Sequence, residues 1–512
     1  MVAGLFLVLL PFFVSIRDVS GWEGNLFEAL TTERIRSSVY GSLLLAFSTA
    51  IAGALIGVPA AYFLARYKVP LSGLWVILFT LPLVMPSYIS SYSYLAALGR
   101  MGFFEDIFGM PFPIEVKGVL FGSWLSMTMV NFPFVFLMTY AALLNLPASI
   151  EESALSLGFS KRQVFFKIIL PNIKIPVFSG MLMIALYSLS DFGTPAIMNY
   201  RTLTFEIFKY WDIGRFSHSS LYALVLITLA FLILFAEGII NRKSHYELKN
   251  KNCKPVSREK LSSGGVTGVL SFFITIVFIA ILLPVITIIY WAMQGHEKFS
   301  VSDRLKEATG HSLTLALLTA VFALFFAFPF AWLAIREKGK FAIVADKVSF
   351  LGNMLPGVVI ALALVSFFVS FRINGFTLYH TLAMPVLGCA IRFLPQAVNS
   401  LKTSLAQINP SLEEAAVSLG RTPFQAFKSV TLPLIKPGAL AAFALVFITT
   451  IKELPITLML SPPGERYLTQ NIWDFIDEAE YSRVAVPALM LLIISSLSLF
   501  FILKQNKRRV NA

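Results

Sequence analysis

The chain alternates long apolar runs with short polar segments, and the runs have the length that crosses a membrane. A hydrocarbon core of about 30 Å takes about 20 apolar residues in a helix. In lipid a segment must satisfy its own backbone hydrogen bonds, which favours helices. The pattern predicts twelve spans, near residues 2–16, 39–65, 72–98, 118–144, 176–198, 219–240, 266–293, 312–335, 349–371, 380–401, 438–460 and 484–503.

The first apolar run begins almost at Met1 and has the length of a signal peptide. It lacks a basic start and a clear small-residue cleavage site, so we expect a true membrane span. The most polar stretch, 241–265, separates six runs from six others. This organisation predicts an all-α membrane protein of about twelve transmembrane helices in two pseudo-symmetric six-helix halves. The predicted domains are 1–240 and 266–512, joined by a cytoplasmic linker, 241–265.

Two polar segments repeat each other across the halves. The first repeat segment, Ser149–Pro171, reads SIEESALSLGFSKRQVFFKIILP, and the second, Ser411–Pro433, reads SLEEAAVSLGRTPFQAFKSVTLP. Eleven of their 23 positions are identical at a constant offset (411 − 149 = 262), and Pro133 and Pro395 share that offset. Halves with six spans each enter the membrane in the same orientation, which indicates two lobes related by an axis along the membrane normal.

Local signals predict a short helix, a glycine turn and a second helix in each repeat segment. Ser or Thr followed three residues later by Glu or Gln is typical of a helix start, and glycine of a helix end. The expected capping boxes are Ser149/Glu152, Ser160/Gln163, Ser411/Glu414 and Thr422/Gln425. The expected turns are at Gly158 and Gly420, and the second helices are expected to stop near Pro171 and Pro433.

Composition confirms the class and charge sets the orientation. Hydrophobic residues make up 57% of the chain and charged residues 13%, against about 25% charged in soluble domains. With the first terminus placed inside, 24 Lys and Arg fall on the inner side and 14 on the outer side. This asymmetry predicts that both termini are cytoplasmic and explains the +13 net charge without nucleic acid. The two cysteines, Cys253 and Cys389, lack metal-site spacing.

Two acids lie at matching positions within predicted spans. Asp191 in SLSDFGTPAIM and Glu453 in TIKELPITLML are 262 positions apart. Charges inside spans cost about 2.5–3.5 kcal/mol on insertion scales and are often functional. We expect Pro195 and Pro455 to break the helices nearby, as near a pathway. The acids could form a cation route or gate, or each could pair with a neighbour, such as Arg392 for Glu453, and only shape the bundle.

The repeat segments resemble the cytoplasmic motif of ABC importer permeases, in which E-A-A-x-x-x-G is followed ten residues after the glycine by I-x-L-P. The resemblance implies that each short helix docks into a cleft of an ATP-binding cassette ATPase subunit, so that one chain with two copies takes two such subunits. It assigns this coupling role to Glu151, Glu152, Ala154, Gly158, Glu413, Glu414, Ala416 and Gly420. No phosphate-binding G-x-x-x-x-G-K-[ST] motif occurs in the chain. We therefore expect a non-enzymatic permease without a cofactor of its own, with ATP and Mg on the ATPase.

A finer resemblance, through SDFGTPAIM, KELPITLML and IWDFIDEAEYSRVAVPALML, is to the fused permeases of ferric-iron importers. It implies a bacterial inner-membrane protein served by an extracytoplasmic substrate-binding protein. Thiamine, polyamine and phosphonate permeases share much of this layout and remain alternatives. An alternative of another class is an ion-coupled secondary transporter, with Asp191 and Glu453 as proton sites.

Overall fold

The computed structural model describes residues 2–20, 26–244, 258–295, 302–337, 339, 352, 355–370 and 378–510. Within these ranges the regular structure is helical, and the β contact is an isolated parallel bridge between Tyr67 and Glu259. The all-α fold expected from the apolar runs is confirmed. Residues 245–257 of the predicted linker, including Cys253, lie outside the described residues.

The described helices form two compact units, each described here by itself. The N-unit comprises Phe27–Phe205 and Thr228–Gln294, and the C-unit comprises Met1–Leu26, Glu206–Ile227 and Gly295–Ala512. The division passes within α12 (Leu203–Asp212) and α13 (Phe216–Ser244).

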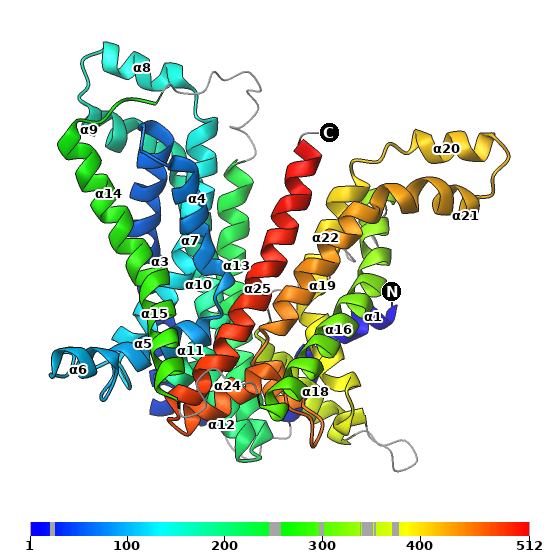
Figure 1. Ribbon diagram of the computed structural model, residues 1–512. Coiled ribbons are helices and arrows are strands. Elements are labelled where there is room, and N and C mark those ends of the chain that lie inside the picture. The colour runs from blue at the N-terminus through cyan, green and yellow to red at the C-terminus, as the bar shows by residue number, and fades with distance from the viewer. Residues whose placement is uncertain are drawn as a thin grey trace. The chain divides into compact units, whose positions relative to one another are not determined.

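The N-unit is built around three long helices that pack on one another, α3, α7 and α10 (Figure 1). Glycines allow close approach: a Cβ on Gly180 of α10 would lie 2.7 Å from Val135 Cα of α7, and small residues are common where membrane helices touch. The helices of this unit are α2 (Leu26–Leu30), α3 (Glu33–Arg66), α4 (Ser72–Thr80), η1 (Leu81–Val84), α5 (Ser87–Leu98), α6 (Phe103–Phe108), α7 (Leu120–Asn145), α8 (Ala148–Ser156), α9 (Lys161–Val164), η2 (Phe165–Ile169), α10 (Leu170–Ser190), α11 (Gly193–Ile197), α14 (Ser263–Val277), η3 (Phe278–Leu282) and α15 (Leu283–Gln294).

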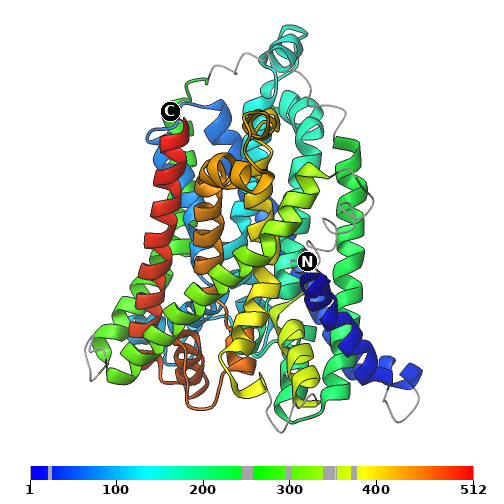
Figure 2. The ribbon, with the colours of Figure 1, turned by 90° about the vertical axis from the view of Figure 1, so that its right-hand side faces the viewer.

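The C-unit repeats this arrangement with α16, α19 and α22, and α25 packs against α22 and α24 (Figures 1 and 2, red helix). Its helices are α1 (Val2–Ser20), α16 (Asp303–Arg336), α18 (Gly357–Ser370), η4 (Leu378–His380), α19 (Ala383–Leu405), α20 (Ser411–Ser418), α21 (Pro423–Ala426), η5 (Phe427–Thr431), α22 (Leu432–Ile451), α23 (Pro455–Leu460), α24 (Leu468–Asp477) and α25 (Tyr481–Val510).

The sequence repeat is visible in the helices themselves. α3 and α16 each have 34 residues and start 270 positions apart (303 − 33 = 270). Each begins after a hydroxyl cap, since the side chains of Thr32 and Ser302 accept hydrogen bonds from backbone N–H groups three residues on. α10 and α22 start 262 positions apart (432 − 170 = 262). The two pseudo-symmetric halves expected from the sequence are therefore present.

Each unit contains the first membrane helix of the other half of the sequence. α1, from the first half, packs on α18 in the C-unit. There Ser366 Oγ donates a hydrogen bond of 2.6 Å to the carboxylate of Asp18. α15, from the second half, packs on α5 in the N-unit, where Trp291 Nε1 donates to Ala96 O at 3.1 Å. The compact units therefore do not coincide with the two halves of the sequence repeat. The domain boundaries 1–240 and 266–512 stay a prediction.

Helices lie in all twelve ranges predicted to cross the membrane. Within the described residues, seven continuous helical stretches are long and apolar enough to span by themselves, and a bent pair, Ser72–Val84 with Ser87–Phe108, makes an eighth. The pair turns by 95°. Met85, before Pro86, has an extended backbone (φ −75°, ψ 125°), as expected for a residue that precedes proline.

Candidate functional site

The repeat segments form a short helix, a tight turn and a second helix, as predicted. In the first segment α8 is followed by Gly158 with φ +86° and then α9, and in the second α20 is followed by Gly420 with φ +87° and then α21 (Figure 1). A positive φ of this size costs an L-residue with a side chain about 1–2 kcal/mol. Glycine therefore fixes both turns, and the expected helix ends at Gly158 and Gly420 are confirmed.

Two of the four predicted capping boxes are present and two are wrong. Ser160 with Gln163, and Thr422 with Gln425, each exchange side-chain and backbone hydrogen bonds. α8 and α20 instead begin after a proline cap, Pro147 and Pro410, without a side-chain cap bond. Ser149 and Ser411 consequently lie inside the first turn. The backbone N–H of Ser411 instead donates a hydrogen bond to the side chain of the upstream Asn409, at 3.1 Å from Oδ1.

The second helix of each segment does not stop at its proline, which corrects the prediction for Pro171 and Pro433. A π-helical turn, η2 or η5, precedes the proline, and the chain then continues directly into α10 or α22. Proline lacks an N–H and crowds the carbonyl of the preceding turn, and the wider π turn accommodates both effects. The result is one continuous helical stretch in each half, Lys161–Ser190 and Pro423–Ile451.

A buried ion pair holds the first short helix to α3. Arg66, the last residue of α3, donates from Nε to Glu151 Oε1 at 2.8 Å and from Nη1 to Leu143 O at 2.9 Å. Arg66 is 5% exposed and Glu151 9%. Removing one partner of a buried pair is costly because the other charge is left unpaired. Glu151, one of the predicted coupling residues, therefore points into the protein and not toward a partner.

The second half carries the equivalent pair. Arg336, the last residue of α16, donates from Nη2 to Glu413 Oε1 at 3.0 Å. Thr431 Oγ1 donates to the same carboxylate oxygen at 2.6 Å. Arg66 and Arg336 are 270 positions apart and Glu151 and Glu413 are 262 apart. Neither arginine was predicted as a site residue, although both stand at the ends of matching apolar runs, a signal that the sequence contains.

The remaining site residues divide between an inner and an outer face. Ala154 and Ala416 are 4% and 7% exposed and face the chain itself, whereas Glu152, Glu414, Gly158 and Gly420 are exposed. The most exposed apolar side chains of the segments, Leu157 at 79% and Leu419 at 86%, are again 262 positions apart. Each segment therefore exposes a leucine at the matching position, and neither leucine was predicted as a site residue.

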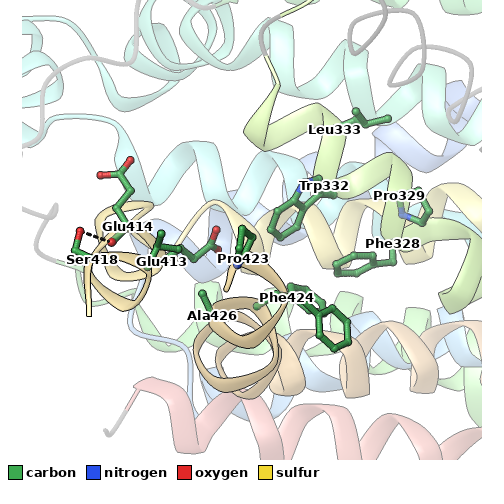
Figure 3. Close-up of a pocket in the computed structure, with 12 residues that line it drawn as sticks. Phe328, Pro329, Trp332, Leu333, Glu413, Glu414, Ser418, Pro423, Phe424 and Ala426 are labelled. Carbon is green, nitrogen blue, oxygen red and sulfur yellow. Dashed lines mark hydrogen bonds between the residues drawn. The ribbon is translucent and has the colours of Figure 1, made fainter. Parts of the chain in front are cut away.

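A cavity of about 820 Å³ lies between the second segment and the end of α16 (Figure 3). The side chains of Trp332 and Phe328 point toward α20 and α21 in this view. It is lined by Phe328, Pro329, Trp332, Leu333, Glu413, Glu414, Val417, Ser418, Pro423, Phe424, Ala426 and Phe427. Beside the first segment, Tyr62 of α3 occupies the position that matches Trp332, and its ring centroid lies 4.7 Å from that of Phe165.

The two span acids lie at helix breaks, as expected. α10 ends at Ser190 and α11 begins at Gly193, while α22 ends at Ile451 and α23 begins at Pro455. Asp191 accepts hydrogen bonds from Ser87 Oγ and, at 2.8 Å, from the backbone N–H of Thr194.

Glu453 forms the ion pair that the sequence allowed with Arg392, Nη1 to Oε1 at 2.6 Å. Asp191 thus contacts the start of α11, and Glu453 contacts α19. Across the described residues no group of three His, Cys, Asp or Glu side chains is arranged to hold a metal ion.

The turn glycines give a direct test of the site's geometry. A Cβ at Gly158 or Gly420 meets nothing within 4 Å, so an alanine there is opposed by backbone conformation alone. We expect Gly158→Ala and Gly420→Ala each to destabilise the turn by about 1–2 kcal/mol. Asparagine, which adopts this conformation more readily, should cost less. Limited proteolysis of the turn measures the effect, and an Ala variant as resistant as wild type would contradict it.

Comparison with known proteins agrees with this architecture. The model of the family described as the binding-protein-dependent transport system inner membrane component matches residues 53–245 and 320–511, one match in each half. The Fe(3+)-transport system permease protein FbpB 2 of Haemophilus influenzae is 31% identical over 97% of this chain and 95% of its own length.

Other relatives are more distant or shorter. The ferric transport system permease protein FbpB of Actinobacillus pleuropneumoniae is 21% identical over 97% of this chain and 77% of its own length. The molybdenum transport system permease protein ModB of Escherichia coli is 30% identical over 36% of this chain and 88% of its own length. With both halves matched and a full-length relative, the chain belongs to the family of inner-membrane components of binding-protein-dependent transport systems.

Proposed function

We propose that this permease imports ferric iron, delivered by an extracytoplasmic binding protein and driven by two ATP-binding cassette ATPase subunits. The observation that carries the substrate is the 31% identity with an Fe(3+)-transport permease along nearly the whole of both chains. The relatives named for 2-aminoethylphosphonate and molybdenum match over only 38% and 36% of this chain. Thiamine, polyamines and phosphonates remain the alternatives from the sequence.

The ATPase subunits would dock one on each repeat segment, on the cytoplasmic side; the excess of Lys and Arg supports a cytoplasmic location for both termini as well. The coupling residues would be Glu151, Glu152, Ala154, Gly158, Glu413, Glu414, Ala416 and Gly420, with the inner acids and alanines holding the short helices. The exposed Leu157 and Leu419 would then meet the partner. ATP and Mg would bind to the ATPase.

Alternating access follows from this arrangement. When ATP binding closes the ATPase dimer, the two segments are displaced, and each displacement passes along a continuous helix, Lys161–Ser190 or Pro423–Ile451. The ligand's effect is a shift between inward-open and outward-open populations. The chain itself contributes no covalent step.

Reconstitution with the ATPase and binding protein tests the substrate. We expect ATPase activity to be stimulated by binding protein loaded with ferric ion, and not by thiamine-, polyamine- or phosphonate-loaded counterparts. Equal or greater stimulation by one of the others would overturn ferric iron. Transport by the purified chain alone in a proton or sodium gradient would favour a secondary transporter instead.

Asp191 and Glu453 are proposed as pathway residues because they occupy matching positions at helix breaks. Their contacts with Ser87 and Arg392 equally support a role that only shapes the bundle. Asp191→Asn and Glu453→Gln separate the two, since each removes charge and keeps size. A pathway role predicts at least a tenfold loss of iron uptake per folded transporter, about 1.4 kcal/mol or more at the rate-limiting step, beyond any loss of folded protein caused by the broken Ser87 or Arg392 contact. Intact uptake would refute it.

A further inference from the structure

The end of the linker lies against the first repeat segment. The backbone N–H of Glu259 donates to Arg66 O at 2.9 Å, and the N–H of Lys68 donates to Glu259 O at 2.8 Å. These two bonds make the isolated β-bridge of the N-unit. The end of the linker therefore contacts the end of α3, beside the ion pair between Arg66 and Glu151.

Side chains extend this contact to three further helices. Glu259 pairs with Lys161 of α9. Arg258 donates to Ser72 Oγ of α4 at 3.2 Å and to Tyr140 OH of α7 at 3.4 Å. Two consecutive linker residues thus touch α3, α4, α7 and α9.

The contact connects two elements that the sequence separates widely. α14 begins at Ser263, four residues after Glu259, and Ser262 caps it. α8 is held by Arg66, whose carbonyl oxygen accepts from Glu259. The start of α14 and the short helix α8 are therefore linked through a few hydrogen bonds around Arg66.

The second repeat segment lacks the side chains for such a contact. At an offset of 262, Lys161 is matched by Pro423 and Tyr140 by Lys402. A proline cannot pair with a glutamate, and a lysine repels an arginine. The ion pair and the tyrosine contact are thus possible at the first segment and not at the second.

We propose that Arg258 and Glu259 are positioning residues that hold the first repeat segment, and not the second, in the orientation its ATPase subunit requires. The inference rests on the proposed function, in which both segments dock ATPase subunits. It makes the two docking sites unequal: the first is fixed from the linker as well as from α3, and the second from α16 and η5.

Site-specific crosslinking in the assembled transporter tests this inference. A cysteine is placed at Leu157 or at Leu419, in a chain with Cys253 and Cys389 replaced by alanine, and its crosslinking to the ATPase is timed in membrane vesicles. Lys161→Glu and Glu259→Lys each turn the ion pair into a like-charge contact. We expect each to slow Leu157 crosslinking about threefold to fivefold, the size appropriate to an exposed pair, and to leave Leu419 unchanged.

The charge swap and a neighbouring lysine provide the controls. The double variant Lys161→Glu/Glu259→Lys should restore the Leu157 rate, which a merely unfolded segment would not do. Arg258→Ala should slow it, and Lys260→Ala should not. Unchanged Leu157 rates in all single variants, or equal losses at Leu157 and Leu419, would overturn the inference. If neither cysteine crosslinks in the otherwise wild-type chain, the proposed ATPase docking itself fails, and the inference with it.

Discussion

Replacing Arg66 by methionine is expected to destabilise the chain by about 3–5 kcal/mol, the cost of leaving one partner of a buried ion pair without the other. Glu151 is 9% exposed and would keep a carboxylate facing the space that the guanidinium filled. The Leu143 carbonyl would also lose its donor. The measurement is the thermal unfolding midpoint of the purified chain in detergent, followed by fluorescence.

Two variants show whether the buried charge is the cause. Arg66→Met/Glu151→Met removes both charges and should recover most of the lost stability, because a hydrophobic pair can replace a buried ion pair at little cost. Arg336→Met should cost less than Arg66→Met, since Glu413 has a side chain 22% exposed and keeps the hydrogen bond from Thr431. Equal midpoints for wild type and Arg66→Met would contradict the prediction.

Gly357→Ala is expected to have the second large effect, through steric conflict with an ion pair. A Cβ at Gly357 would overlap both Arg392 Nη1 and Glu453 Oε1. Those two atoms are 2.6 Å apart and the Glu453 side chain is 6% exposed. The methyl group would displace the ends of both side chains, and we expect the loss of about 1–3 kcal/mol that is typical of overpacking, seen as a lowered unfolding midpoint and a reduced folded yield in membranes.

Matched substitutions separate this conflict from a general effect of alanine. Gly310→Ala in α16 meets nothing within 4 Å and should be neutral or stabilise by up to about 1 kcal/mol. Ser87, the residue that matches Gly357 at the 270 offset, already carries a side chain. Ser87→Ala removes a hydrogen bond to Asp191 and should cost about 1.5–3 kcal/mol. A Gly357→Ala protein as stable as Gly310→Ala would refute the steric argument.

Local rules predicted the repeat segments well where the deciding contacts are local. The caps at Ser160 and Thr422 involve residues three positions apart, and the turns at Gly158 and Gly420 need only a backbone preference. The caps expected at Ser149 and Ser411 failed because residues just upstream set the helix start. The helix ends predicted at Pro171 and Pro433 were wrong because a π-helical turn precedes each proline and the helix continues through it.

Contacts between distant parts of the chain were beyond these rules. Arg66 lies 85 positions from Glu151, and Arg336 lies 77 from Glu413. No spacing rule covers such distances, although an offset of 270 relates α3 to α16 and an offset of 262 relates the two repeat segments. The alanines expected to receive a partner are buried in their own units, because a short helix with one small face packs that face inward. The leucines that follow them are left outside.

The exchange of first helices has a consequence for how this chain can be divided. A break in the linker would give one polypeptide that carries α1 and another that carries α14 and α15, each bearing a helix whose packing surface belongs to the other. Alone, the first polypeptide would lack the α18 surface on which α1 packs, and the second would lack the α5 surface on which α15 packs. Each would then expose to lipid a helix face that is buried against protein in the intact chain. Two separate polypeptides would therefore have to associate in the membrane to bury these surfaces, and covalent continuity keeps the partners together.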